Sequence, residues 1–531
     1  MRRSWVVMAA VVGTLLVLAY PVNNNVRYEV GVHRVSGYSV AETFSHRPIT
    51  FRLISAAQSW LPNVVSDATT PSGSFVHAWV FEAGFRLMAA LAAAAAALLL
   101  TAGLRRRLGS SAWAYGVAAY AGLMFTAPAT GEPDWWAALV AVAAVGAGLL
   151  GSHWTGGAWA GVLLAIVALM KISSLPVALA ALVLIVAFDR SRGLVALATA
   201  FVAGCAGVVL IWWLAPREIA WLLDIRALQP PLWTSDTPDE QRGYLLNLAA
   251  RWPTIALLPA FFVWASRREV VAGLAATALT GLGVVGQGQY FIYHAVPTVV
   301  LSAVLAVATL RRSRAALRWP FLACALWTLV AFVSPAGWRV AHARPLLAGT
   351  IAWVVLLFVA QYWVLRRGRG QPRAAADRWA ALLVLVAMLA TQTPWSGESL
   401  TLGTRAKTPV ENLTLLRGQL AVAERVRTVV GTGPVVYLTF GSYTYLIGNP
   451  TSCRYPSPLF LQRPGAATKV SAATRGENLA CVTQPGAGWL IWDRTWLHRK
   501  GAPGDLLATL DATWACERAT VVGGLTLCPR R

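Results

Sequence analysis

Four carboxylates in this sequence stand where they could serve acid–base chemistry. Glu29 follows the first apolar run by a few residues, and Glu42 lies further along the same polar segment. Glu132 and Asp134 flank Pro133 at the start of another apolar run. A positioned carboxylate can take a proton from an attacking hydroxyl. A charge left in lipid costs about 2.5–3.5 kcal/mol, so acids beside apolar runs usually face a polar cavity.

Each of these acids also has a purely structural interpretation. Glu29 and Glu42 could be solvated loop charges that pair with nearby arginines. Glu132 and Asp134 could cap a helix that begins at Pro133. We favour Glu29 as a general base, with Glu42 as the second choice and Glu132 or Asp134 as a supporting acid.

Basic and amide side chains in the same regions could bind an anionic substrate. Lys171 ends an apolar run, where it could either extend to the membrane interface or contact a phosphate. Arg52 could also contact a phosphate. The other substrate-binding candidates lie in three polar segments, and they are His33, Arg34, His46, Arg47, Arg217, Gln289 and His294.

The composition shows what kind of protein must position these groups. Of 531 residues, 57% are hydrophobic and only 13% are charged. Soluble domains contain roughly 25% charged residues, so this chain cannot cover its surface with polar groups. The composition excludes a soluble enzyme and a disordered chain. It predicts a polytopic α-helical membrane protein.

Apolar runs long enough to cross a membrane need about 20 residues, and on this criterion the sequence contains about thirteen. They lie near residues 4–22, 77–103, 112–128, 135–151, 156–170, 174–188, 194–214, 253–265, 270–286, 292–310, 318–334, 346–365 and 379–393. The first run follows Met1-Arg2-Arg3 without a small-residue cleavage site after it. We therefore expect an uncleaved first span.

The net charge of +23 is explained by where the arginines lie. If the N-terminus is cytoplasmic, nearly every inner loop carries arginines, from 105–107 to 366–373. Only the inner turn 152–154 has none. This positive-inside pattern argues against nucleic-acid binding, the other meaning of a basic chain. It predicts a plasma-membrane protein with long outer loops at 23–76 and 215–252.

The outer loops contain further features. The stretch around Glu42, with Phe44, Ile49, Phe51 and Leu53, suits a helix that lies on the membrane surface. The loop at 215–252 could be a mobile lid over a site or a plain connection.

We expect residues 1–393 to form the transmembrane domain and residues 394–531 a small extracytoplasmic α/β domain. Spacing predicts helices over 409–429 and 505–514, and strands over 435–446, 489–492 and 519–527. Four cysteines lie in this tail, which favours disulfides in an oxidising compartment. Among three pairings we favour Cys453–Cys481 and Cys516–Cys528. A zinc site is the alternative, but the paired spacing typical of zinc ligands is missing.

These segments together resemble the GT-C superfamily of membrane glycosyltransferases. Members often carry an acid-x-x-Val-Tyr-Arg pattern after the first span, and Glu29 to Arg34 is similar, with Glu for the commoner Asp. His46 to Ile49 looks like a Tyr/His-x-Pro-Leu stretch, and Lys171 like a lysine found at the head of a span. Gln287 to Pro297 looks like Gln-x-Lys-x-x-x-Tyr-His-x-x-Pro, with Gln289 for Lys.

The tail adds to this resemblance, because Phe440 to Leu446 and Pro450 to Tyr455 are similar to the extracytoplasmic domain of some actinobacterial members. The resemblance implies transfer of a hexose or pentose, such as mannose, from a polyprenyl-phosphate donor to an extracytoplasmic glycan, lipid or protein. Direct attack by the acceptor hydroxyl would invert the anomeric carbon. The resemblance also implies no cofactor or essential metal. The outer loops show no metal-ligand spacing either.

Two other functions fit a polytopic chain with large outer loops. A polymerase or ligase of lipid-linked glycans would use His294 with Arg339 or Arg344 on a lipid-diphosphate donor. A transporter or flippase would need no chemistry, but transporters usually show internal repeats and charges at mid-membrane. Neither feature is found in this sequence.

Overall fold

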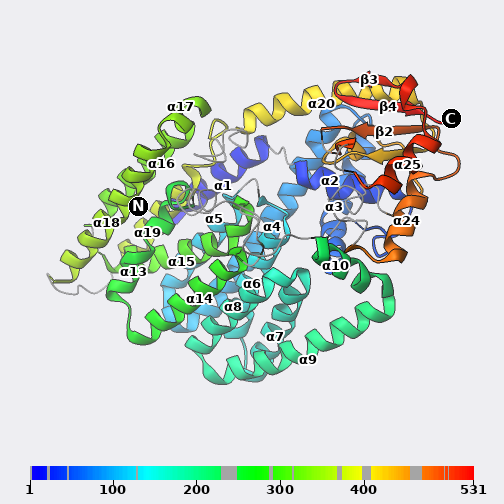
Figure 1. Cartoon of the computed structure of the whole chain (residues 1–531). Helices are drawn as coiled ribbons and strands as arrows, with labels where there is room; N and C mark the ends of the chain where they lie inside the picture. The colour runs from blue at the N-terminus through cyan, green and yellow to red at the C-terminus, as the bar shows by residue number, and fades with distance from the viewer. Residues whose placement is uncertain are drawn as a thin grey trace. The chain divides into compact units, whose positions relative to one another are not determined.

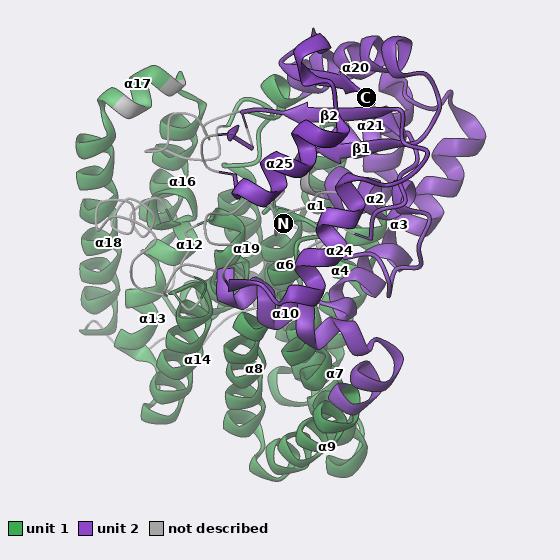
Figure 2. Ribbon diagram, turned by 45° about the vertical axis from the view of Figure 1, so that its right-hand side comes forward, with its two compact units in different colours: residues 1–21, 86–207, 231–412 green, residues 22–85, 208–230, 413–531 purple. Residues whose placement is uncertain are grey.

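Helices make up most of the chain. The computed structural model describes residues 3–20, 24–44, 47–126, 129–228, 248–285, 287, 291–313, 316–366, 374–396, 408–454, 469–495, 497–499 and 502–531. Figure 1 shows their order along the chain. The chain divides into two units (Figure 2). The first contains residues 1–21, 86–207 and 231–412, and the second contains residues 22–85, 208–230 and 413–531.

The first unit is built from apolar helices. They are α1 (Arg3–Ala19), α5 (Ala112–Met124), α6 (Pro133–Leu149), α7 (His153–Met170), α8 (Leu175–Phe188), α9 (Arg190–Leu214), α12 (Pro253–Ala256), α13 (Leu258–Trp264), α14 (Arg267–Val285), α15 (Val296–Arg312), α16 (Arg318–Val333), α17 (Ala336–Ala341), α18 (Ala343–Arg366) and α19 (Ala374–Leu389). Helix α4 (Phe75–Leu108) begins in the second unit and ends in the first, and the last residues of α9 belong to the second.

These helices make the chain a multi-pass membrane protein. Six helical segments of the described chain are long and apolar enough to cross a bilayer, and five shorter helices are also apolar. A helix satisfies its own backbone hydrogen bonds, which lipid cannot do. The count of thirteen spans and the cytoplasmic side of the N-terminus stay predictions. The predicted run 253–265 is two helices, α12 and α13, because Pro259 lacks the N–H that a continuous helix needs.

The second unit combines three segments that are separated in the sequence. Its helices are α2 (Asn24–Ser36), α3 (Ile49–Thr69), α10 (Pro216–Leu228), α20 (Pro409–Val430), α21 (Tyr443–Ile447), α24 (Ala472–Val482) and α25 (Gly504–Thr513). Its strands are β1 (Val435–Leu438), β2 (Trp489–Asp493), β3 (Thr520–Val522) and β4 (Leu525–Pro529). They form one sheet in the order β1-β2-β4-β3, in which β1 and β2 are parallel and the other pairs antiparallel.

Two strands predicted from the sequence differ from the structure. The strand predicted over 435–446 ends at Leu438, because Gly441 turns the chain with a φ of +75° and α21 follows. The strand predicted over 519–527 is a hairpin of β3 and β4. Gly523 and Gly524 form its turn with φ values of +55° and +88°, which only glycine adopts at low cost.

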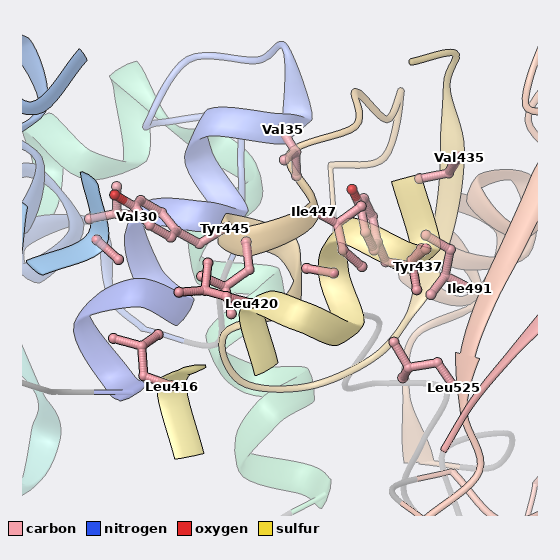
Figure 3. Close-up of a cluster of buried hydrophobic side chains, with 14 of the residues drawn as sticks. Val30, Val35, Leu416, Leu420, Val435, Tyr437, Tyr445, Ile447, Ile491 and Leu525 are labelled. Atoms are coloured by element: carbon pink, nitrogen blue, oxygen red, sulfur yellow. The ribbon is translucent and has the colours of Figure 1, made fainter. Parts of the chain in front are cut away.

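The tail shares its hydrophobic core with the first long loop. Figure 3 shows Val30 and Val35 of α2 in one cluster with Leu420 of α20 and Tyr445 of α21. A Cβ atom on Gly31 would lie only 2.5 Å from the Tyr445 amide nitrogen, so glycine is required for this close approach. Helix α2 is thus fixed against α21. The boundary between residues 393 and 394 stays a prediction, because residues 397–407 lie outside the described part.

Helix α3 has an unusual distribution of side chains. Its buried side chains include Arg52, Gln58 and Ser59, whereas Trp60 and Val64 are exposed. Of the apolar residues that predicted a helix on the membrane surface, Phe44, Ile49 and Phe51 are buried and only Leu53 is exposed. The exposed apolar face of α3 is made by other residues. Several polar side chains of α3 therefore face the protein interior, although Asp67 near its end is exposed.

The structure pairs Cys453 with Cys481 and Cys516 with Cys528, the two pairs favoured from the sequence. The six cysteines leave Cys205 and Cys324 as thiols. We therefore expect alkylation of the unfolded chain to modify only these two residues without reductant, and all six after reduction. Mass spectrometry of the peptides checks this. Six modified residues without reductant would contradict both disulfides.

Candidate functional site

A buried polar cluster in the first unit surrounds Asp134. The Asp134 Oδ2 atom lies 2.9 Å from His294 Nδ1 and 3.5 Å from Lys171 Nζ, and Oδ1 accepts a hydrogen bond of 3.2 Å from Gln287 Nε2. Lys171 also donates to Gln287 Oε1. Side chains of Asp134 and His294 are each 2% exposed, whereas that of Lys171 is 22% exposed. We call these four residues the Asp134 cluster.

Helix ends position each member of the Asp134 cluster. Asp134 lies in the first turn of α6, directly after Pro133. Lys171 follows the last residue of α7, in extended backbone. His294 lies in a short 3₁₀ helix before α15. All three residues lie beside a proline or a helix end, where an apolar helix gives way to a more polar segment.

Two of these residues make contacts that their simpler interpretations do not require. Asp134 could have been only a helix cap, yet its carboxylate contacts side chains from two other segments. Lys171 could have extended to the interface, yet its ammonium group points to Asp134 and Gln287. Glu132, the other acid of this turn, is 3% exposed and makes no side-chain cap on α6.

A second polar cluster lies in the second unit around Glu29 of α2. Glu29 is 5% exposed, and its Oε1 atom lies 3.5 Å from Arg47 Nε. Arg52 Nη1 donates to the Arg47 carbonyl oxygen at 3.0 Å, and Arg52 Nη2 donates to Glu218 Oε2 at 2.9 Å. Glu218 Oε1 accepts from the backbone N–H of Ile49 at 2.7 Å. We call Glu29, Arg47, Arg52 and Glu218 the Glu29 cluster.

The Glu29 cluster joins three elements of the second unit. Glu29 comes from α2, Arg52 from α3 and Glu218 from the first turn of α10. Arg52 and Glu218 are completely buried. In that environment each charge needs the other, since an unpaired buried ion costs several kcal/mol. The ion pair therefore fixes α3 against α10. The hydrogen bond from Arg52 to the Arg47 carbonyl oxygen helps to place Arg47 beside Glu29.

His33 lies near this cluster. Burial, together with the positive charge of Arg52, lowers the pKa of His33 to about 3. The imidazole is therefore neutral at pH 7. Among the described residues, neither ring nitrogen of His33 has a hydrogen-bond partner.

The remaining predicted site residues lie elsewhere in the second unit. Glu42 is exposed, and its carboxylate accepts hydrogen bonds from Ser39, which lower its pKa. Arg34 pairs with Asp67 at 2.8 Å, and Arg217 pairs with Glu477 at 2.5 Å, both at the surface. His46 and Gln289 lie outside the described residues.

Sequence reasoning missed two members of these clusters. Gln287 opens the segment that resembles a GT-C motif, but only Gln289 and His294 of that segment were proposed to bind substrate. Glu218 lies in the long second outer loop, where nothing distinguished it from its acidic neighbours. Its position at the first turn of a helix after Pro216 was the one available signal. In the described residues, no group of three or more metal-ligand side chains comes together.

Comparisons with known proteins show the fold of the chain. No protein-family model matches the sequence, and no curated protein matches it. ArnT from Cupriavidus metallidurans in the apo state superposes with a TM-score of 0.60 at 14% identity, over 99% of this chain and 98% of ArnT. The same protein bound to undecaprenyl phosphate gives a TM-score of 0.57, with equal identity and coverage.

The archaeal oligosaccharyltransferase AglB from Archaeoglobus fulgidus, in complex with an inhibitory peptide and a dolichol-phosphate, gives a TM-score of 0.41 at 11% identity. That match covers 96% of this chain and 72% of AglB. At 14% identity, the likeness to ArnT shows a shared fold.

The buried pair in the Glu29 cluster generates a prediction about stability. Arg52→Met leaves Glu218 buried without its partner, so it should lower the free energy of unfolding in detergent by about 3–5 kcal/mol. The double variant Arg52→Met/Glu218→Leu should recover most of this loss. Arg34→Met, at an exposed pair, should cost under about 1 kcal/mol. Equal losses for Arg34→Met and Arg52→Met would contradict the role of burial.

Proposed function

Because this chain has the fold of the GT-C superfamily, we propose that it is a glycosyltransferase that uses a polyprenyl-phosphate-linked sugar. The observation that carries the proposal is the match to ArnT bound to undecaprenyl phosphate along 99% of this chain. The two buried polar clusters support it, since both contain groups suited to an anionic donor. The proposed acceptor is an extracytoplasmic glycan, lipid or protein.

Glu29 is the proposed general base. The acceptor hydroxyl gives its proton to the Glu29 carboxylate as its oxygen attacks the anomeric carbon. The bond from that carbon to the phosphate oxygen breaks, and polyprenyl phosphate leaves with the electron pair. Direct attack inverts the anomeric centre. Glu29 suits this role because it is buried, with its Oε1 atom 3.5 Å from Arg47 Nε. Glu42 is less suited, because it is exposed and bound to Ser39.

Lys171 is the proposed ligand of the donor phosphate. It is the most exposed of the three charged or ionisable side chains in the Asp134 cluster, so an anion can reach its ammonium group. Asp134 and Gln287 hold that ammonium group in position. We therefore assign Asp134, Gln287 and His294 positioning roles. Charge-assisted contacts to phosphate stabilise the leaving group as negative charge develops on it.

The finer assignments belong to the same proposal. The sugar is a hexose or pentose, with mannose favoured by the family resemblance, and no metal takes part. The N-terminus is cytoplasmic and the tail extracytoplasmic, so transfer takes place on the outer side of the plasma membrane. Arginines at the inner loops support this orientation.

Replacing the proposed base tests the mechanism. Glu29→Gln keeps the shape of the side chain but cannot take the proton, so transfer from a labelled polyprenyl-phosphate sugar should fall by about 100-fold or more. Glu42→Gln is the matched control and should keep most of the activity. Full activity of folded Glu29→Gln would remove Glu29 from the mechanism, and loss in Glu42→Gln alone would transfer the role to Glu42.

Replacing the proposed phosphate ligand tests donor binding. Lys171→Gln should raise the KM for the donor about tenfold, because one charge-assisted contact is lost. Lys469 is an exposed lysine far along the chain in the second unit, so Lys469→Gln should leave the KM unchanged. An unchanged donor KM in folded Lys171→Gln would contradict the assignment.

The released lipid separates the proposed reaction from its alternatives. A glycosyltransferase of this kind releases polyprenyl monophosphate with each sugar transferred. A polymerase or ligase that uses His294 with Arg339 or Arg344 would release the diphosphate. A transporter or flippase would release neither. Chromatography of the lipid product after one round of transfer therefore decides among the three functions.

A further inference from the structure

The first unit contains an apolar cavity of about 510 Å³ between helices α6, α8, α14 and α15. Small side chains make this space, since each of these four helices contributes alanines to its lining, among them Ala141, Ala181 and Ala276. Protein interiors are otherwise close-packed, with few voids larger than a water molecule. A cavity of this size is within the range of ligand sites.

The cavity extends along α15. Its lining runs from Pro297, in the first turn of α15, to Arg311 and Arg312 at the end of that helix. These positions are separated by about 22 Å at the helical rise of about 1.5 Å per residue. His294 lies just before α15, and none of the four residues of the Asp134 cluster lines the cavity. The cavity is therefore a different site from that cluster.

The other end of the cavity is positively charged. Arg107, Arg268, Arg311 and Arg312 line it together with Glu269. Arg107 pairs with Asp189 at 3.1 Å, Arg311 pairs with Asp377, and Arg312 lies 3.7 Å from Glu269.

Arg268 completes this end of the cavity. It donates to the Val186 carbonyl oxygen at 3.2 Å and, among the described residues, pairs with no carboxylate. The lining of this end thus keeps an excess of positive charge that ion pairs do not balance.

We propose that this cavity binds one acyl chain of an anionic glycerophospholipid, whose phosphate lies at Arg268 and Arg312. The apolar walls suit a hydrocarbon chain, and guanidinium groups suit a phosphate. The phosphate group is also present in polyprenyl phosphates. However, a polyprenyl chain of undecaprenyl length is several times too long for this space, and its phosphate is proposed to lie at Lys171, beyond the opposite end of α15. The bound phospholipid is therefore a second lipid, and its distinction from the carrier lipid rests on the proposed function.

Binding of defined lipids to the purified full chain tests the proposal. Native mass spectrometry in detergent should show one retained phosphatidylglycerol, with phosphatidylcholine held about tenfold more weakly. Arg268→Gln should weaken phosphatidylglycerol binding by about tenfold, since it removes a charge-assisted contact. Arg267→Gln is the matched control, because Arg267 is the exposed neighbour that does not line the cavity. It should bind the lipid like the unchanged protein.

A second pair of variants tests whether the chain enters the cavity. Ala276→Phe fills the space and should abolish retention of phosphatidylglycerol. Leu274 lies on the same helix and is 49% exposed, so Leu274→Phe should leave retention unchanged. If Ala276→Phe does not fold, the comparison of Arg268→Gln with Arg267→Gln decides the outcome.

Three results would overturn the proposal. The first is equal binding of phosphatidylcholine and phosphatidylglycerol. The second is an unchanged affinity in Arg268→Gln. The third is one-for-one displacement of phosphatidylglycerol by undecaprenyl phosphate, which would assign the cavity to the carrier lipid.

Discussion

The cost of burying charge in an apolar chain is the constraint on which this structure depends. Asp134 is almost completely buried among membrane helices, where an uncompensated carboxylate is not tolerated. His294, Gln287 and Lys171 supply the compensation from three separate segments. Lys171 follows the end of α7, Gln287 follows α14, and His294 precedes α15. The contacts to Asp134 thus link helix ends that apolar packing alone would allow to slide.

The second unit meets the same constraint with arginines. Arg52 and Glu218 are completely buried and neutralise each other, and Arg27 likewise pairs with Glu82 in a buried contact. These pairs leave the apolar face of α3 exposed, which is the reverse of a soluble helix. Glu29 takes its position from this arrangement, because Gly31 presses α2 against α21 while Arg47 holds the carboxylate. The candidate base is therefore positioned by residues distant in sequence.

The positive charges of the chain have more than one role. Arginines at loop ends are typical of orientation in the membrane. Several of them also line one end of the apolar cavity in the first unit, where ion pairs with Asp189 and Asp377 order their side chains. A residue type that orients the chain can thus also shape a surface for a lipid phosphate. The few buried acids matter most for the candidate chemistry, because Glu29 lies against Arg47 and Asp134 against Lys171.

The sequence by itself determined the membrane class, most of the helices, the cysteine-bearing tail and the resemblance to the GT-C fold, because hydropathy and spacing are local properties. It also identified Asp134, Lys171 and His294 as separate candidates. Only the tertiary structure decided that they form one cluster, since Asp134 and His294 lie 160 residues apart and meet through helix packing. The same holds for Glu218, whose partner Arg52 is 166 residues away. The β3–β4 hairpin was missed although its signal is local, because two glycines between short β-rich runs are typical of a hairpin turn. Side chains distant in sequence contact one another only after the helices that carry them have packed.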